Sequence, residues 1–396
     1  MSASYKLASD SWDQTEFDAI KRVLSSGQLT LGPEVDIFED EFSEFLNVKH
    51  SIMVNSGSSA NLLGVAALVF SGSAAPGSVV VPAVSWSTTY YPWTQYGFKL
   101  KFVDIDPDTL NFNMNQLEKA ITPDVTAVCG VNLLGNPSCI DEVAELCSSC
   151  EIPLLEDNCE SFGASVNGKL AGSFGTIGTH SFFFSHHLQT IEGGMLSTDN
   201  DQLAALARSL RAHGWSRDKK SGNLSRVDAG DFGSSFEFLY PGYCLRPTEI
   251  AGAVGRAQLR KAAQHQKVRL SNAESFKKLM VDFGDIIRVQ TDGGRQKVES
   301  SWFGFSLICH GAAKNHRNLL KSILDDFKIE SRPIVAGNFT RQPVMQFLEH
   351  EIFGSLDEAD SVHTEGLFVG NDGRCLTEEL NLLSKAIEKF ARKVRQ

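Results

Sequence analysis

The chain has 396 residues, of which 42% are hydrophobic and 21% are charged, and its formal net charge is -11. This composition is ordinary for a globular protein, and the length favours two domains over one. The acidic balance argues against a general nucleic-acid binder, because such a protein needs a surplus of basic residues to neutralise phosphates.

The N-terminal sequence and the cysteine spacing indicate where the protein is located and whether its thiols are reduced. The opening MSASYKLASDSWDQ lacks the charged-then-apolar pattern of an export signal, and no apolar run is long enough to span a membrane. We therefore predict a cytoplasmic protein without membrane contact. The eight cysteines are scattered and the CxxC of Cys147 and Cys150 has no second pair, so we expect reduced thiols, no disulfide and no metal site.

The first third of the chain begins with helices and continues with alternating strands and helices. Phe17, Ile20 and Leu24 recur at helical spacing, and a second helical pattern follows Gly32. Short apolar runs then alternate with helix-like stretches, which favours a mostly parallel sheet flanked by helices. Strands are expected at 51–54, 78–82, 101–105, 126–134 and 152–157, with helices at 61–70, 113–121 and 140–147.

The second half of the chain predicts a smaller domain. Strands at 179–184 and 193–198 and a helix at 202–211 complete the first domain, and the polar, glycine-rich stretch 215–240 is typical of a long functional loop. A long helix at 248–279 leads into about a hundred residues of mixed strands and helices. We expect a large α/β domain over 1–250 and a smaller α/β domain over 251–396.

Three short patterns at strand ends suit a flat phosphorylated ligand. The stretch NSGSSAN, which contains Gly57 and Ser58, lies between a strand and a helix, where exposed amides make a phosphate cradle. An ordinary helix cap is the alternative. The strand LLED ends in Asp157, whose carboxylate is suited to pair with a protonated ring nitrogen, and Trp86 follows another strand, where its ring is suited to stack on a cofactor. A solvated helix cap and a core tryptophan are the respective alternatives.

The segment SFFFSHHLQTIEGG carries two adjacent histidines, His186 and His187, between an aromatic strand and a Glu-Gly-Gly turn. Packing alone does not explain such a pair. A metal site is one alternative, but adjacent strand residues point to opposite faces and rarely bind one ion. We therefore expect proton transfer rather than metal binding at this place.

In this order, the patterns resemble the DegT/DnrJ/EryC1/StrS sugar aminotransferase family, from about residue 6 to the C-terminal domain. The resemblance implies a fold-type I pyridoxal-phosphate (PLP) transferase fold, aspartate aminotransferase-like, with a mostly parallel seven-stranded sheet. It implies that Gly57, Ser58 and Ser181 bind the cofactor phosphate. It also implies that Trp86 stacks on the ring, that Asp157 meets the pyridine nitrogen, and that Glu160 approaches the ring hydroxyl.

One departure from the family pattern is decisive for the chemistry. The catalytic lysine of the family stands six residues before the glutamate of the Glu-Gly-Gly turn, and counting back from Glu192 gives His186. Imidazole cannot make the covalent link with the cofactor aldehyde that a lysine amine makes. Its ordinary pKa near 6.5 suits proton transfer. His186 is thus expected to be the catalytic acid and base, with PLP or pyridoxamine phosphate (PMP) held non-covalently.

Both branches of the family that carry this exchange are sugar 3-dehydratases. One adds an iron–sulfur cluster, but the second half of this chain has only three dispersed cysteines. The resemblance therefore implies the cluster-free branch, which removes the C3 hydroxyl of GDP-4-keto-6-deoxymannose and uses glutamate to restore PMP. The alternatives are transamination or dehydration of another nucleotide-linked keto-sugar, and a non-catalytic sensor or scaffold.

Substrate and partner contacts are the last expectations. His213, Arg217 and Arg332 are candidates for the nucleotide-sugar, because arginine suits diphosphate and carboxylate groups. The resemblance implies a homodimer with the active site at the subunit interface. Where the family has an asparagine that reaches the partner's cofactor phosphate, this chain has Cys244, so either the contact is rearranged or a neighbour such as Arg246 replaces it.

Overall fold

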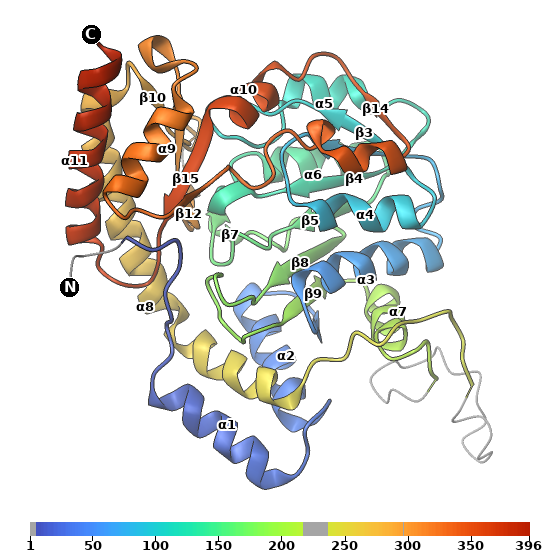
Figure 1. Ribbon diagram of the computed structural model, residues 1–396. Coiled ribbons are helices and arrows are strands. Elements are labelled where there is room, and N and C mark those ends of the chain that lie inside the picture. The colour runs from blue at the N-terminus through green and yellow to red at the C-terminus, as the bar shows by residue number, and fades with distance from the viewer. Residues whose placement is uncertain (1–4, 217–236, 296) are drawn as a thin grey trace.

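A computed structural model describes residues 5–216, 237–295 and 297–396, and its centre is one large sheet (Figure 1). Five neighbouring strand pairs are parallel, and only the pairs made by β9 are antiparallel. The order is β1 (His50–Val54), β9 (Gly194–Thr198), β8 (Ile177–Ser181), β5 (Leu154–Asp157), β4 (Val125–Val131), β2 (Ser78–Pro82), β3 (Lys99–Val103) and β14 (His350–Ile352). The mostly parallel sheet is therefore confirmed.

The sheet has eight strands, one more than the expected seven. The extra strand, β14, is three residues long, and its two outer residues are exposed. It pairs in parallel with β3 at the edge of the sheet, where His350 lies opposite Leu100. The sequence HEI has no apolar run, so periodicity does not reveal it.

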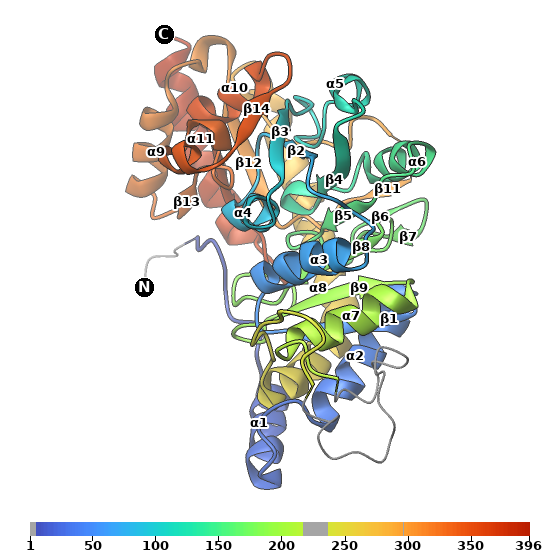
Figure 2. The same ribbon diagram turned by 90° about the vertical axis from the view of Figure 1, so that its right-hand side faces the viewer.

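Helices cover both faces of the sheet because the strand side chains alternate between two cores. Val79 and Val81 pack towards α3 (Gly57–Phe70) and α4 (Ser87–Gln95), whereas Val80 packs towards α5 (Met114–Ala120) and α6 (Ile140–Ser149). Figure 2 shows α3 and α7 (Asp201–Arg211) side by side along the sheet. Helix α3 is apolar on nearly every side, since it packs against the sheet and against both α4 and α7.

A smaller antiparallel sheet follows in the C-terminal part, as expected. Its order is β10 (Ile287–Arg288), β12 (Gly304–Cys309), β15 (Gly366–Gly370) and β13 (Ser331–Arg332). It packs against α8 (Glu249–Met280), α9 (Arg317–Asp326) and α11 (Thr377–Val394). The remaining elements are α10 (Asp357–Glu365) and a three-stranded sheet of β11 (Val298–Glu299), β6 (Ser165–Val166) and β7 (Lys169–Leu170).

Helix α8 connects the two parts of the molecule. Its first half packs against α1 (Gln14–Ser26) and α2 (Pro33–Leu46), and its far end lies beside α11 (Figure 1). The boundary between residues 250 and 251 stays a prediction, although β14 lies beyond it and joins the large sheet. Within the described ranges, no helix has both the length and the apolar character that a membrane crossing requires. All eight cysteines are free.

Candidate active site

A cavity of about 620 Å³ lies at the carboxyl ends of β5 and β8, where parallel sheets bind ligands. Its walls come from both parts of the chain, because Phe368 of β15 and Phe303, which directly precedes β12, also line it. Eight of the ten predicted site residues line it: Gly57, Ser58, Trp86, Asp157, Glu160, Ser181, His186 and Arg332. The local patterns read from separate stretches of sequence thus meet in one place.

The N-terminus of α3 forms one end of the cavity. Ser56 caps this helix by accepting a hydrogen bond from the Ser59 amide at 3.0 Å, which leaves the first amides of the helix pointing outward. A Cβ atom on Gly57 would lie 2.5 Å from Cβ of Ser181, so only glycine permits this approach of helix to strand. Ser58 Oγ lies 2.8 Å from Thr88 Oγ1. Amides and hydroxyls converging at a helix N-terminus are suited to bind a phosphate.

Asp157 is fixed as a hydrogen-bond acceptor at the end of β5. Its Oδ2 accepts from Asn61 Nδ2 at 2.9 Å and from Thr89 Oγ1 at 2.8 Å, and its Oδ1 accepts from the Cys159 amide at 3.2 Å. Asn61 is itself held by Thr179, whose hydroxyl donates to it at 2.6 Å. The carboxylate is therefore buried with its orientation set, as pairing with a cationic ring nitrogen requires.

Trp86 completes the set of groups that fit a phosphorylated pyridine. It is the N-cap residue of α4, and its side chain is 58% exposed although large aromatic residues are usually covered. Its indole lines the same cavity as the cradle and Asp157. A flat ring stacked on this indole would bury apolar surface that is otherwise open to water.

Glu160, three residues after Asp157, lines the same cavity. Burial and the nearby charge of Asp157 raise the pKa of Glu160 to about 7, although the Leu134 amide donates to it at 2.9 Å. A carboxyl group with this pKa exchanges protons near neutral pH. It is thus able to donate or to accept a hydrogen bond at a ring hydroxyl.

His186 lies in a tight turn after β8 and faces the cavity. Its amide donates to the Phe183 carbonyl at 2.8 Å, and its Nδ1 lies 3.5 Å from Ser185 Oγ. The ring packs against Phe303 at 5.2 Å between centroids. Burial and the positive charge of Arg269 lower the pKa of His186 to about 4, so the imidazole is neutral at pH 7 and is able to accept a proton.

His187 points away from the cavity, as expected for adjacent residues. It is buried, and its Nε2 lies 3.2 Å from the Ser301 carbonyl. Burial lowers the pKa of this residue well below its usual value. In the part of the chain that the structure describes, no three histidine, cysteine or acidic side chains are grouped to hold a metal ion.

Comparison with known proteins fits this geometry. The model of the DegT/DnrJ/EryC1/StrS aminotransferase family matches residues 10–385. The chain belongs to this family. It is 42% identical to the GDP-4-keto-6-deoxy-D-mannose 3-dehydratase of Yersinia pseudotuberculosis, over 98% of each chain. Among solved structures, an Escherichia coli enzyme of the same name with bound hydrated PLP is 42% identical with a TM-score of 0.91, covering 98% of this chain and all of that one.

A second solved 3-dehydratase holds a trapped PLP-glutamate geminal diamine. It is also 42% identical with a TM-score of 0.91, and the match covers 96% of this chain and 99% of that one. This chain thus shares its fold, over nearly its whole length, with solved structures that bear the name of one enzyme.

The structure describes two of the three candidate substrate residues and places one of them in the cavity. Arg332, in β13, lines the cavity, and no ion pair fixes its guanidinium among the described residues. His213 does not line the cavity; it has a positive φ of 68°, and its ring packs against that of Trp215 at a tilt of 58°. Arg217 lies outside the described residues. The exposed Cys244 accepts a contact from Arg246 Nη2 at 3.4 Å.

Several residues of the site were not singled out from sequence. Asn61 and Thr89 orient Asp157, and both lie within stretches already read as a phosphate cradle and an aromatic turn. The available signal was helical spacing. Asn61 follows Gly57 by four residues and Thr89 follows Trp86 by three, so each lies about one helical turn after a predicted site residue. Phe303 and Arg269 had no local signal, since only the tertiary fold brings the smaller sheet and α8 to His186.

Proposed function

We propose that this protein is a PLP/PMP-dependent 3-dehydratase of a nucleotide-linked 4-keto-6-deoxy sugar, with GDP-4-keto-6-deoxymannose as the favoured substrate. The observation that carries the proposal is His186. It replaces the family lysine, yet it lines the cavity together with a complete set of groups for the cofactor. The relatives named for this activity are similar over nearly their whole length.

The cofactor would be held without a covalent bond. The amides at Gly57 and Ser58 and the hydroxyl of Ser181 would bind its phosphate, Trp86 would cover one ring face, and Asp157 would keep the pyridine nitrogen protonated. Glu160, with a pKa of about 7, would meet the ring hydroxyl. When bound, PMP supplies an amine that condenses with the sugar ketone and a ring that accepts electrons.

His186 would perform both proton transfers in a fixed order. Because its imidazole is neutral at pH 7, it would first accept a proton from the cofactor carbon that carries the amine, through Nε2, the nitrogen that Ser185 does not contact. The imidazolium then donates that proton to the departing C3 hydroxyl, which leaves as water. Release of the 3-deoxy-4-keto sugar and ammonia would follow, and glutamate would restore PMP with His186 again moving the proton.

The contacts to substrate and partner subunit are part of this proposal. Arg332 is free to bind a diphosphate or a glutamate carboxylate in the cavity. His213 and Arg217 would act on the active site of the partner subunit in a homodimer, since His213 is remote from the cavity of its own chain. The pair of Cys244 and Arg246 would replace the family asparagine there. We also propose a cytoplasmic location.

The test is the mass of the product. Purified protein is incubated with PMP, glutamate and GDP-4-keto-6-deoxymannose, and the nucleotide-sugar is analysed by mass spectrometry and for released ammonia. Loss of one oxygen with ammonia release supports the 3-dehydratase. Gain of an amino group would show an aminotransferase instead. An unchanged sugar, with cofactor bound, would refute this substrate and favour another keto-sugar or a sensor; His186→Asn is the inactive control.

A further inference from the structure

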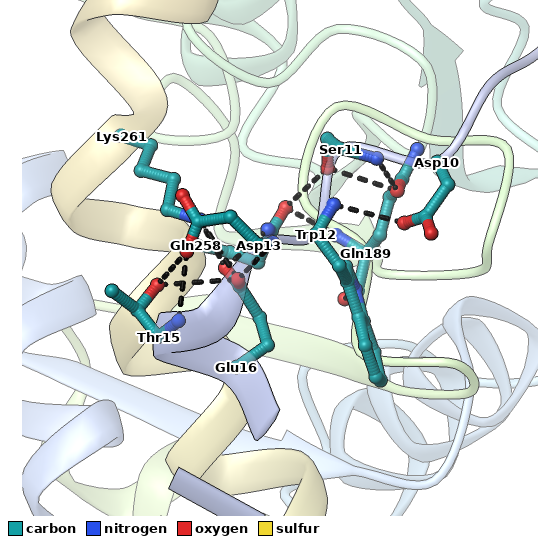
Figure 3. A network of polar contacts seen from close by, with 9 residues as sticks. All are labelled: Asp10, Ser11, Trp12, Asp13, Thr15, Glu16, Gln189, Gln258 and Lys261. Carbon is teal, nitrogen blue, oxygen red and sulfur yellow. Dashed lines mark hydrogen bonds and ion pairs between the residues drawn. The ribbon is translucent and has the colours of Figure 1, made fainter. Parts of the chain in front are cut away.

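The loop that carries His186 is tied to the N-terminal segment through Gln189, three residues further along the chain (Figure 3). Gln189 is 3% exposed and does not line the cavity. Sequence alone did not mark it, because its partners lie nearly 180 residues away.

Both ends of the Gln189 side-chain amide are bonded to this segment. Its Oε1 accepts from the Ser11 amide at 3.0 Å and lies 2.9 Å from Ser11 Oγ, and its Nε2 donates to the Ser9 carbonyl at 2.9 Å. Three contacts to the backbone and side chain of residues 9–11 fix the amide in one orientation. The side chain of Gln189 thus links the loop that carries His186 to residues 9–11.

The backbone of Gln189 is held as well. Its carbonyl accepts from Trp12 Nε1 at 2.8 Å, and its amide donates to Gln258 Oε1 of α8 at 3.3 Å. Trp12 in turn packs edge-on against Phe17 of α1. The residue is therefore fixed from two sides by groups that do not belong to the loop.

Further hydrogen bonds and ion pairs connect the elements behind these contacts. Gln258 Nε2 donates to Glu16 Oε1 at 2.7 Å, and Lys261 binds the same carboxylate at 2.8 Å, which joins α8 to the start of α1 (Figure 3). A capping box at Asp13 begins α1. At the other end, Ser9 Oγ donates to Asp372 at 2.5 Å. Leu7 and Ala8, which directly precede Ser9, line the cavity.

His186 itself has few contacts that set its orientation. Its only side-chain hydrogen-bond contact in the described chain is the 3.5 Å approach to Ser185, which lies in the same loop. The neighbouring side chains Phe183, Phe184 and Ile191 are largely exposed. A proton-transferring group needs support from outside its own loop, because a displacement of about 1 Å reduces rates by as much as about a hundredfold.

We propose that Gln189 is a positioning residue for His186, and that the N-terminal segment 9–12 is the strap that holds it. This inference rests on the proposed role of His186 in proton transfer. The strap fixes residue 189 against Trp12 and Gln258 of α8, and only two residues separate Gln189 from His186, so that constraint reaches the end of the 183–186 turn that carries the imidazole.

Three variants test the proposal. Gln189→Leu keeps the side-chain volume and removes all three amide contacts, and Trp12→Phe removes only the bond to the Gln189 carbonyl while keeping an aromatic ring against Phe17. Gln116→Leu is the matched control. Gln116 also accepts from a backbone amide, that of Asp104 at 2.9 Å, and donates to a distant carbonyl, that of Ser355 at 3.1 Å, but it lies outside the cavity.

Two readouts are needed. The first is the rate of the half-reaction with glutamate per bound cofactor, measured by absorbance with ordinary and α-deuterated glutamate. The second is hydrogen–deuterium exchange of the peptide covering residues 183–192 in the protein without cofactor. We expect Gln189→Leu to be about ten- to a hundredfold slower with an unchanged KM and a retained deuterium effect. We expect Trp12→Phe to be about threefold slower. Loop exchange should rise in both, and Gln116→Leu should match the parent protein in both readouts.

The outcomes separate this inference from the proposed function. A Gln189→Leu rate within twofold of the parent, or an equal loss in Gln116→Leu, would overturn the positioning role. If the parent reacts with glutamate but leaves the GDP-sugar unchanged, the substrate fails while the comparison of variants still decides the role of Gln189. If the parent does not react even with glutamate, the role in proton transfer fails, and unchanged loop exchange in Gln189→Leu would also refute the strap.

Discussion

Replacing Gly57 with alanine tests the phosphate cradle at its tightest point. The new Cβ would lie 2.5 Å from Cβ of Ser181 and 3.0 Å from the sulfur of Cys159. Carbon atoms in contact prefer a separation of about 3.5–4.0 Å, so the helix and the strand must separate by about 1 Å. Ser181 cannot withdraw easily, because its strand β8 is paired with β5 on one side and β9 on the other.

The start of α3 must therefore move, and with it the amides of residues 57 and 58. Overpacking of this kind costs about 1–3 kcal/mol. If that free energy is lost from cofactor binding, the Kd for PLP increases about five- to 150-fold, since about 1.4 kcal/mol corresponds to a factor of ten. The loss should appear mainly in binding, because the cofactor phosphate requires the amides at their present distance from Ser181.

The assay is titration of the apo-protein with PLP, followed by quenching of tryptophan fluorescence and absorbance, with the Tm measured in parallel. Gly284→Ala is the matched control, because the nearest atom to a Cβ there lies 3.7 Å away, an ordinary contact. A Gly57→Ala protein with the parent Kd and the parent Tm would refute the cradle. A lower Tm with an unchanged Kd would show that the contact is structural only.

Other predictions concern the acid–base groups. His186→Asn should lower turnover by about a hundredfold or more while PLP still binds, as equilibrium dialysis would show. His186→Lys should create a covalent link to PLP, visible as a new absorbance band that survives gel filtration. Asp157→Asn should weaken PLP binding and turnover together, since it loses the charge and one or more of three accepted hydrogen bonds, measured by Kd and kcat. Burial lowers the pKa of His180 to about 3 and that of His186 to about 4, whereas both side chains protonate near 6.5 in the unfolded chain. The free energy of unfolding should therefore fall as the pH decreases from 6.5 towards 4, because the unfolded state then binds more protons. Urea unfolding midpoints at about pH 7.5 and about pH 5 measure this difference.

The large sheet was predictable from sequence because its strands are buried on both faces. Runs such as SVVVP and IPLLED carry their signal locally, and the alternation with helices fixes their parallel pairing. Strand β14 escaped prediction because its pairing with β3 is decided by residues about 250 positions apart. Short polar edge strands depend on such tertiary contacts rather than on their own side chains.

The site divides in the same way. Gly57, Asp157 and His186 were recognisable because each stands in a local pattern with a chemical reason for its residue type. His213 was grouped with them on residue type alone, and its backbone with positive φ turns it towards Trp215 instead. Gln189 shows the opposite case, since it has no local pattern and its importance depends on partners in α8 and at the N-terminus.

Two properties of imidazole suit a histidine to the proposed reaction in this cavity. Imidazole is not a primary amine and forms no imine, so it would leave the pyridoxamine form free to meet a ketone, and burial keeps the ring of His186 neutral at pH 7 and able to accept a proton. The consequence is that the cofactor would be retained by non-covalent contacts, among them those of the cradle, Trp86 and Asp157. The same arrangement makes the orientation of the imidazole critical, since no covalent link to the cofactor aligns it. The close approach of Gly57 to Ser181 in the cradle fits the first requirement, retention of the cofactor. The contacts of Gln189 with the strap of residues 9–12 fit the second, a fixed orientation of the imidazole.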